Sequence, residues 1–131
     1  MGRIMIDTSV LIYLLEKAPI EKLVELYRNN DLYVPAIVAF EFLVGVFRTR
    51  KLKLKDLLEQ YFTIVPITYD IIVRASEIEA KLMERGAMLD PRDLLIGATA
   101  IVHEMPLWTY NLKNFKRLEK FGLRITQPIP R

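Results

Sequence analysis

Cysteine is absent from this chain of 131 residues, and histidine occurs only once. The chain therefore has no disulfide bond and no thiolate metal site, and a metal ion would have to be held mainly by oxygen atoms. The absence of cysteine also fits a reducing compartment, and we expect a cytoplasmic protein.

A long uninterrupted apolar run is also missing. The longest candidate, residues 34–47, contains Glu41 and is too short to cross a bilayer. Asp7 and Glu16 interrupt the N-terminal apolar stretch, which argues against a signal peptide. The chain shows no low-complexity segment and no internal repeat, and we expect a soluble protein without a membrane-bound part.

The residues that are present fit one globular domain over residues 1–131. Apolar residues make up 52% of the chain, which is enough for a full core, and the length is typical of one domain. The formal net charge is +3, a mildly basic balance that is compatible with a polyanionic partner.

Strand-like and helix-like segments alternate along the chain. Strands are predicted at residues 3–6, 32–34, 63–67, 107–109 and 124–125. Helices are predicted at residues 9–17, 20–29, 36–48, 54–61, 69–85, 90–103 and 114–120, with a turn at 29–31. Helix 36–48 is apolar almost all round, so we expect it to be buried, with Phe40, Phe42 and Trp108 in the core. The alternation predicts an α/β fold with a mostly parallel sheet of four to five strands and helices on both faces.

Asp7 is the most informative residue of the sequence. It follows the apolar run Ile4–Ile6 and precedes Thr8, Ser9 and a second apolar run, so it stands at the carboxyl end of the predicted first strand. Ligands bind at that edge of open α/β sheets. Asp7 could instead cap the following helix, although Thr8 or Ser9 could take that role and leave Asp7 free to point across the edge.

Glu41 stands alone within an apolar helix. It is the only charged residue between Asp31 and Arg48. A carboxylate in such surroundings must be paired, bound to a metal or protonated, because burial of a lone charge is very costly. A salt bridge to an arginine or a narrow exposed stripe would also explain it, but we favour a functional role.

Asp93 lies in the first turn of a helix that we expect Asp90 to cap and Pro91 to begin. The helix dipole favours an acid in this position, which is one explanation for Asp93. The small and apolar residues 94–102 predict a buried helix whose first turn opens at a sheet edge, and for this reason we favour a functional role.

The three acids together suggest a metal site. Oxygen ligands alone favour hard cations such as Mg²⁺ or Mn²⁺. Without a metal, three converging carboxylates would repel one another, and at least one would hold a proton. A divalent cation removes that penalty, so we interpret the acids as metal ligands.

Four short segments carry a family resemblance. They are Ile-Asp-Thr-Ser around Asp7, the helical Glu41, Asp-Leu-Leu-Ile-Gly-Ala-Thr-Ala from Asp93, and Trp-Thr-Tyr-Asn-Leu-Lys-Asn-Phe from Trp108. In this order and spacing they resemble the PIN-domain ribonucleases, and within them the VapC toxins of prokaryotic toxin–antitoxin pairs. The resemblance covers nearly the whole chain, from Ile4 to about Ile125.

The resemblance implies a metal-dependent endoribonuclease that hydrolyses phosphodiester bonds of RNA and leaves a 5′-phosphate on the downstream fragment. It implies that the three acids are catalytic and bind Mg²⁺ or Mn²⁺, and that Thr8 or Ser9, and Thr109, support them by hydrogen bonds. Family members usually form homodimers and bind a small antitoxin, so a second copy and a cognate antitoxin are expected partners.

The chain departs from the family in one segment. Many members carry a fourth acid in the stretch that matches Thr109 to Phe115, where this chain offers only Asn111 and Asn114. An asparagine can accept a hydrogen bond from a water or bind a metal weakly through its carbonyl oxygen. This leaves open whether one or two metal ions bind without substrate, and it allows for reduced activity.

Two basic clusters offer a path for an RNA backbone. The first consists of Arg48, Arg50, Lys51, Lys53 and Lys55. The second consists of Lys113, Lys116, Arg117 and Lys120. Tyr110 and Phe115 flank the second cluster, and we expect them to stack on bases. Solvated helix faces explain the first cluster equally well, whereas the second directly follows the candidate site and is favoured.

Three other protein classes are alternatives. A haloacid-dehalogenase-type phosphatase needs a second Asp two residues after the first, where this chain has Ser9. A receiver domain needs an acceptor Asp after a later strand, where residues 64–67 are followed by Thr68. A catalytically degenerate PIN fold that binds RNA or protein is the stronger alternative, because Asn111 and Asn114 favour it, although the three retained acids count against it.

Overall fold

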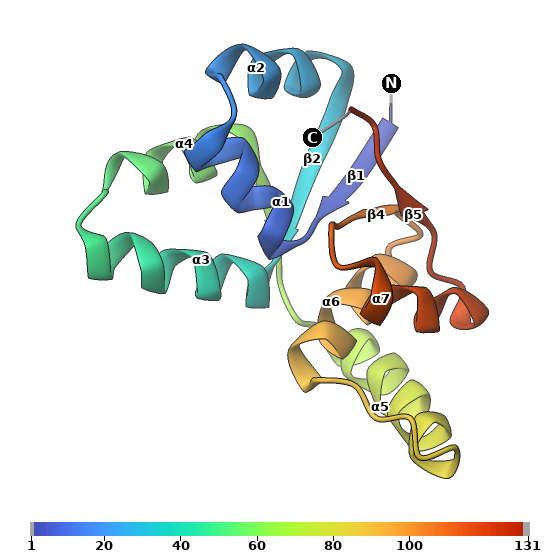
Figure 1. Ribbon diagram of the computed structural model, residues 1–131. Coiled ribbons are helices and arrows are strands. Elements are labelled where there is room, and N and C mark those ends of the chain that lie inside the picture. Colours follow the sequence, from blue (N-terminus) through green and yellow to red (C-terminus); the bar gives the residue numbers. More distant parts are fainter. Residues whose placement is uncertain (1, 130–131) are drawn as a thin grey trace.

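The computed structural model describes residues 2–129 as a five-stranded parallel sheet with helices packed around it (Figure 1). The strands are β1 (Gly2–Ile6), β2 (Asn30–Pro35), β3 (Thr63–Val65), β4 (Leu107–Trp108) and β5 (Ile125–Thr126). The α-helices are α1 (Thr8–Ile12), α2 (Ile20–Asn29), α3 (Ala36–Thr49), α4 (Lys53–Tyr61), α5 (Tyr69–Glu84), α6 (Pro91–Val102) and α7 (Leu112–Phe115). A π-helix, η1 (Tyr13–Lys17), continues α1, and a 3-10 helix, η2 (Lys116–Phe121), continues α7. The predicted α/β class is confirmed.

The centre of the sheet is buried on both faces. In the view of Figure 1, α1, α3 and α4 lie to the left of β1 and β2, α2 lies at the top, and α5 to α7 lie below and to the right. The last three residues of β1 are all buried, as are both residues of β4. Such continuous burial, without the alternation of a half-exposed strand, is typical of parallel strands covered on both sides.

The strand order places the candidate site. The order is β3-β2-β1-β4-β5, so the chain moves outward from β1 in one direction and then returns to build the other half of the sheet. A crevice opens at such a switch point, at the carboxyl ends of the two central strands. Ile6 is in register with Trp108, so Asp7 and Thr109, the next residues along each strand, emerge side by side at this edge.

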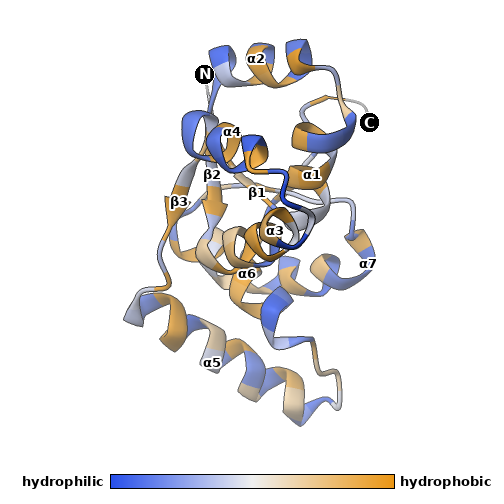
Figure 2. Ribbon diagram, turned by 90° about the vertical axis from the view of Figure 1, so that its left-hand side faces the viewer, coloured by the Kyte–Doolittle hydropathy of each residue, from blue (hydrophilic) through white to orange (hydrophobic). Residues whose placement is uncertain are grey.

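Helix α3 differs from the prediction. Phe40, Val44 and Phe47 lie on one face of it and are exposed, Phe40 to 64%. In Figure 2, α3 is seen end-on and is mostly orange, the colour of apolar residues. The placement of Phe40 in the core was therefore wrong, while Phe42 and Trp108 are buried as predicted. A helix that is apolar on every side gives no period from which its buried face can be found.

The predicted turn at residues 29–31 is also wrong. Helix α2 ends at Asn29 and β2 begins at Asn30 without an intervening turn. The Asn29 Nδ2 donates to the Glu25 carbonyl at 2.9 Å, and the Asn30 Nδ2 donates to the Leu26 carbonyl at 3.2 Å. The Asn30 side chain therefore satisfies one of the last four carbonyls of α2, which have no partner within the helix.

No helix within residues 2–129 is long and apolar enough to span a membrane.

Candidate active site

Asp7 lies buried at the start of α1 and makes contacts through both carboxylate oxygens. Oδ1 accepts a hydrogen bond from the Thr8 backbone N–H at 2.7 Å, which makes Asp7 the N-cap of α1. Oδ2 accepts from the Thr109 hydroxyl at 2.6 Å and from the Ser9 hydroxyl at 3.4 Å. The two interpretations of Asp7, as a cap and as a site residue at the sheet edge, therefore do not exclude each other.

The loop after β4 holds these hydroxyls in place. The Asn111 backbone N–H donates to the Thr109 hydroxyl oxygen at 2.9 Å, and the Tyr110 backbone N–H donates to the Ser9 hydroxyl oxygen at 3.3 Å. Because each hydroxyl oxygen accepts from a backbone N–H, its own proton is directed to Asp7. Two neighbouring strands thus fix the orientation of one carboxylate.

Asp93 lies in the first turn of α6 and is half-buried. Its Oδ2 accepts a hydrogen bond from the Asn114 side-chain amide at 3.1 Å. As predicted, Asp90 is the N-cap of α6 and Pro91 its first residue. Asn114 therefore contacts the candidate site through Asp93 and does not itself line the cleft.

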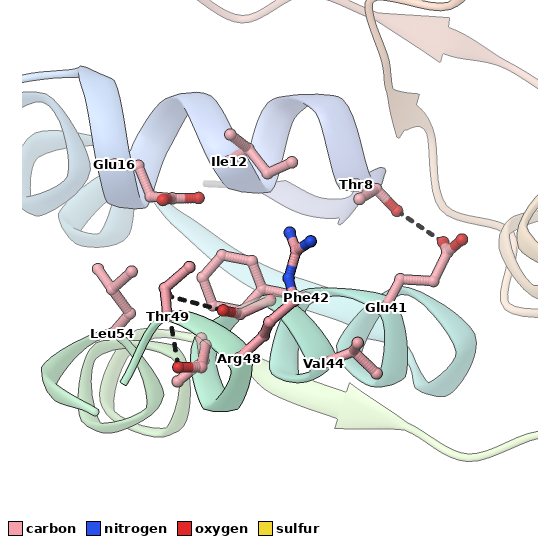
Figure 3. Close-up of a pocket in the computed structure, with 11 residues that line it drawn as sticks. Thr8, Ile12, Glu16, Glu41, Phe42, Val44, Arg48, Thr49 and Leu54 are labelled. Atoms are coloured by element: carbon pink, nitrogen blue, oxygen red, sulfur yellow. Dashed lines mark hydrogen bonds between the residues drawn. The ribbon is translucent and has the colours of Figure 1, made fainter. Parts of the chain in front are cut away.

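Glu41 is neither fully buried nor alone. A quarter of its side-chain surface is exposed, and Oε2 forms an ion pair with the Arg92 guanidinium at 2.9 Å. Its Oε1 accepts from the Thr8 hydroxyl at 3.1 Å, the contact drawn as a dashed line at the right of Figure 3. The arginine salt bridge considered from the sequence is present. Its partner was missed, because Arg92 lies 51 residues away along the chain.

One cleft of about 380 Å³ brings the predicted acids together. It is lined by Asp7, Thr8, Ser9, Ile12, Glu41, Asp90, Arg92, Asp93, Ile96 and Asn111. A second groove, of about 310 Å³, runs between α3 and the α1–η1 helix and shares Thr8, Ile12 and Glu41 with the cleft (Figure 3). Arg48 lies on the wall of that groove, whereas Arg50, Lys113, Lys116 and Arg117 line neither.

The prediction that both Tyr110 and Phe115 stack on bases is wrong for Phe115. Phe115 is completely buried, so it cannot stack on a base. Helix α7 turns this ring inward, toward the position of Gly97 on α6. Tyr110 is partly buried and meets Tyr13 and Trp108 edge-on, with ring centroids 6.0 and 6.2 Å apart.

The surroundings of Asp7 and Asp93 in the cleft disfavour the ionised form of both carboxyl groups. Burial raises the pKa of the Asp7 carboxyl above its ordinary value of 3.8, and the charge of Asp93 raises it further, against hydrogen bonds from Thr109, Thr8 and Ser9. Burial likewise raises the pKa of Asp93, with the charges of Asp90 and Glu41 adding to the effect. Within residues 2–129, no three His, Asp or Glu side chains lie close enough together to hold a metal ion, and Glu41 is turned toward Arg92.

The raised pKa of Asp7 predicts a pH dependence of stability in metal-free protein. A folded-state pKa above the unfolded one gives a stabilising contribution that is present below the unfolded value and is lost as pH rises through the folded value. The free energy of unfolding of the native chain, relative to Asp7→Asn, should therefore fall as pH rises from 3.8 toward neutrality. Urea unfolding in EDTA across this range would measure it. Parallel pH profiles for the two proteins would contradict it.

A family model described as PIN domain matches residues 4–120. The chain belongs to the PIN-domain family. Ribonuclease VapC1 of Methanocaldococcus jannaschii is 37% identical over 124 residues, which cover 95% of this chain and 87% of that protein. Ribonuclease VapC1 of Rickettsia felis is 31% identical and covers 93% of both chains. The family resemblance drawn from the four segments is therefore confirmed.

Solved structures share this PIN fold. The toxin–antitoxin complex VapBC2 of Rickettsia felis, bound to a promoter DNA fragment, contains a chain that superposes with a TM-score of 0.81 at 25% identity. The match covers 95% of the present chain and 97% of that one. A chain of the DNA-bound VapBC complex of Salmonella typhimurium superposes with a TM-score of 0.82 at 22% identity, a likeness of fold.

Proposed function

We propose that this PIN-domain protein is a divalent-metal-dependent endoribonuclease. The observation that carries the proposal is the meeting of Asp7 and Asp93 in one cleft at the switch point of the sheet, with Glu41 on its rim. The names of relatives across nearly the full chain support ribonuclease activity. Cleavage of phosphodiester bonds in RNA is the reaction that the donor set and the relatives support together.

The donors in the cleft fit a hard cation such as Mg²⁺ or Mn²⁺. Asp7 and Asp93 supply carboxylate oxygens, and each charge is disfavoured in the metal-free cleft by burial and by neighbouring acids. A divalent cation would neutralise this charge. We propose that Asp7 and Asp93 hold the ion and that Glu41 joins them only when it leaves Arg92. When bound, the ion would supply charge neutralisation at phosphate and activation of water for hydrolysis.

The other side chains orient these acids. Thr109, Ser9 and the Thr8 backbone fix the plane of the Asp7 carboxylate, and Asn114 holds one oxygen of Asp93. Changes to residues that orient metal ligands in this way typically cost about 10- to 100-fold in metal affinity or activity. We propose that Arg48, on the wall of the adjoining groove, contacts the RNA backbone.

We propose further that the protein is the toxin of a VapBC-type pair, acts in the cytoplasm, forms a homodimer and is held by a cognate antitoxin. The relatives named VapC and the similarity to chains of VapBC complexes support an antitoxin partner. The exposed apolar face formed by Phe40, Val44 and Phe47 on α3 supports a protein partner, because contiguous exposed apolar residues commonly mark interaction sites.

The test is cleavage of a labelled single-stranded RNA by antitoxin-free protein, with Mg²⁺ or Mn²⁺ and with EDTA. We expect cutting with either cation and none in EDTA. RNA binding without cutting, on varied RNAs and with metal bound, would favour the non-catalytic PIN fold. The neutral residues Asn111 and Asn114 are the feature of the sequence that fits this alternative.

A further inference from the structure

Four acidic side chains and one positively charged side chain line the cleft. Asp7, Glu41, Asp90 and Asp93 line it, and Arg92 is the only positively charged side chain of the described residues that lines it as well. A phosphate group that approaches these carboxylates is repelled unless positive charge stands beside it. A metal ion between Asp7 and Asp93 would neutralise the charge of one phosphate. Arg92 lies elsewhere, at the exposed rim of the cleft.

Asp90 fixes the guanidinium of Arg92 in one orientation. The Nε and Nη2 atoms of Arg92 donate to the two carboxylate oxygens of Asp90 at 3.2 and 3.0 Å. The Arg92 backbone N–H donates to the same carboxylate at 2.9 Å. Because Asp90 is itself the N-cap of α6, the orientation of the guanidinium is tied to the end of a helix.

Arg92 still has donors to offer. A guanidinium carries five N–H groups. Asp90 engages one on Nε and one on Nη2, and Glu41 engages one on Nη1 at 2.9 Å. One N–H on each terminal nitrogen therefore has no partner within residues 2–129, and 59% of the side-chain surface is exposed. Two free donors on a guanidinium whose orientation Asp90 holds can bind oxygens of a phosphate diester.

We propose that Arg92 binds a backbone phosphate of the RNA next to the bond that is cut, and that Asp90 is the positioning residue that aims it. This inference rests on the proposed ribonuclease function. Glu41 then has two roles that exclude each other, as partner of Arg92 in the free protein and as metal ligand in the complex. When Glu41 moves to the metal, the phosphate supplies the negative charge that Arg92 loses.

The ion pairs of Arg92 are not expected to hold the fold together. Exposed pairs of this kind contribute little to stability, and the N-cap contact of Asp90 survives a change at Arg92 because it uses the backbone. Arg92→Ala is therefore expected to fold, which makes a loss of RNA binding interpretable.

The experiment measures binding of a short fluorescein-labelled single-stranded RNA by anisotropy, in an Asp7→Asn background that blocks cleavage, with Mg²⁺ and a series of salt concentrations. We expect Arg92→Ala to weaken binding about 10- to 100-fold, the range for one charge-assisted hydrogen-bonded contact. The slope of log affinity against log salt should become shallower by about 0.7, the value for one lost phosphate contact on a single strand. The same substitution with Asp7 intact should raise KM for cleavage.

Three further variants decide the interpretation. Arg85→Ala, which removes an exposed arginine outside the cleft, should leave the slope unchanged. Arg92→Lys keeps the charge without the planar fork, and it should restore the slope but only part of the affinity. Asp90→Asn removes a negative charge, and this electrostatic change alone would tighten RNA binding. We expect weaker binding instead, because Asp90 no longer holds the guanidinium of Arg92 in its orientation.

An unchanged slope in Arg92→Ala, or a change equal to that of Arg85→Ala, would overturn the inference. Tighter binding by Asp90→Asn would overturn the positioning role. Failure of the parent protein to bind RNA at all would instead count against the proposed function.

Discussion

Asp7→Asn is expected to abolish metal-dependent RNA cleavage, with a loss of about 10³-fold or more, the upper range for removing one group that stabilises a charged transition state. Asn keeps the shape of the side chain and an oxygen that can accept the Thr8 N–H, so α1 stays capped. What is lost is one of the negative charges that would hold the cation. The measurement is the single-turnover cleavage rate with saturating Mn²⁺.

The same substitution is expected to change stability little in EDTA, because the amide nitrogen that replaces Oδ2 cannot accept the hydrogen bonds of Thr109 and Ser9, while the loss of a buried charge offsets that cost. Burial and the charge of Asp93 make an ionised Asp7 unfavourable in the metal-free fold, so a neutral side chain relieves that penalty. Asp31→Asn, which changes an exposed acid on β2 away from the cleft, is the matched control and should retain full activity. Substantial cleavage by folded Asp7→Asn protein would refute the assignment of Asp7, and a loss in Asp31→Asn would show that the assay reports net charge.

The position of Asp7 could be predicted from the sequence because its cause is local. A short apolar strand followed by an acid puts that acid at the carboxyl edge of a parallel sheet, whatever else the chain does. Asp90 and Pro91 likewise predict the start of α6, because the residue preferences at a helix N-terminus act within one turn. The register of β1 with β4, which sets Thr109 against Asp7, was not predictable in the same way, because it depends on how two distant segments pair.

Arg92 and the face of α3 show where local patterns fail. Arg92 adjoins a predicted site residue, yet its contact with Glu41 exists only because α3 and α6 pack together. On α3, apolar residues occur on all sides, so the sequence could not separate the buried Phe42 from the exposed Phe40. Both errors concern tertiary packing, which depends on contacts between segments that are distant in the sequence.

Asn114→Asp is expected to raise the affinity for Mn²⁺ by about 10- to 100-fold, the range over which residues that contact metal ligands alter affinity. The Asn114 amide lies 3.1 Å from Asp93 Oδ2, so the substitution replaces a hydrogen-bond donor with a second carboxylate beside the first. With a cation present, the new oxygen adds charge to the donor set. Without one, the two carboxylates repel, the pKa of Asp93 rises further, and the melting temperature falls. Calorimetric titration with Mn²⁺ alone and melting with and without the cation would measure both effects.

Asn111→Asp separates position from charge. Asn111 lines the cleft but makes no hydrogen bond to Asp93, so an acid there adds the same charge without the same contact. We expect a smaller gain in affinity and little loss of stability in EDTA. Equal gains in the two variants would mean that net charge alone governs metal binding, and no gain in either would mean that the α7 side of the cleft lies out of reach of the ion. A gain confined to Asn114→Asp would establish that the contact with Asp93, and not charge alone, governs the affinity of the cleft for metal.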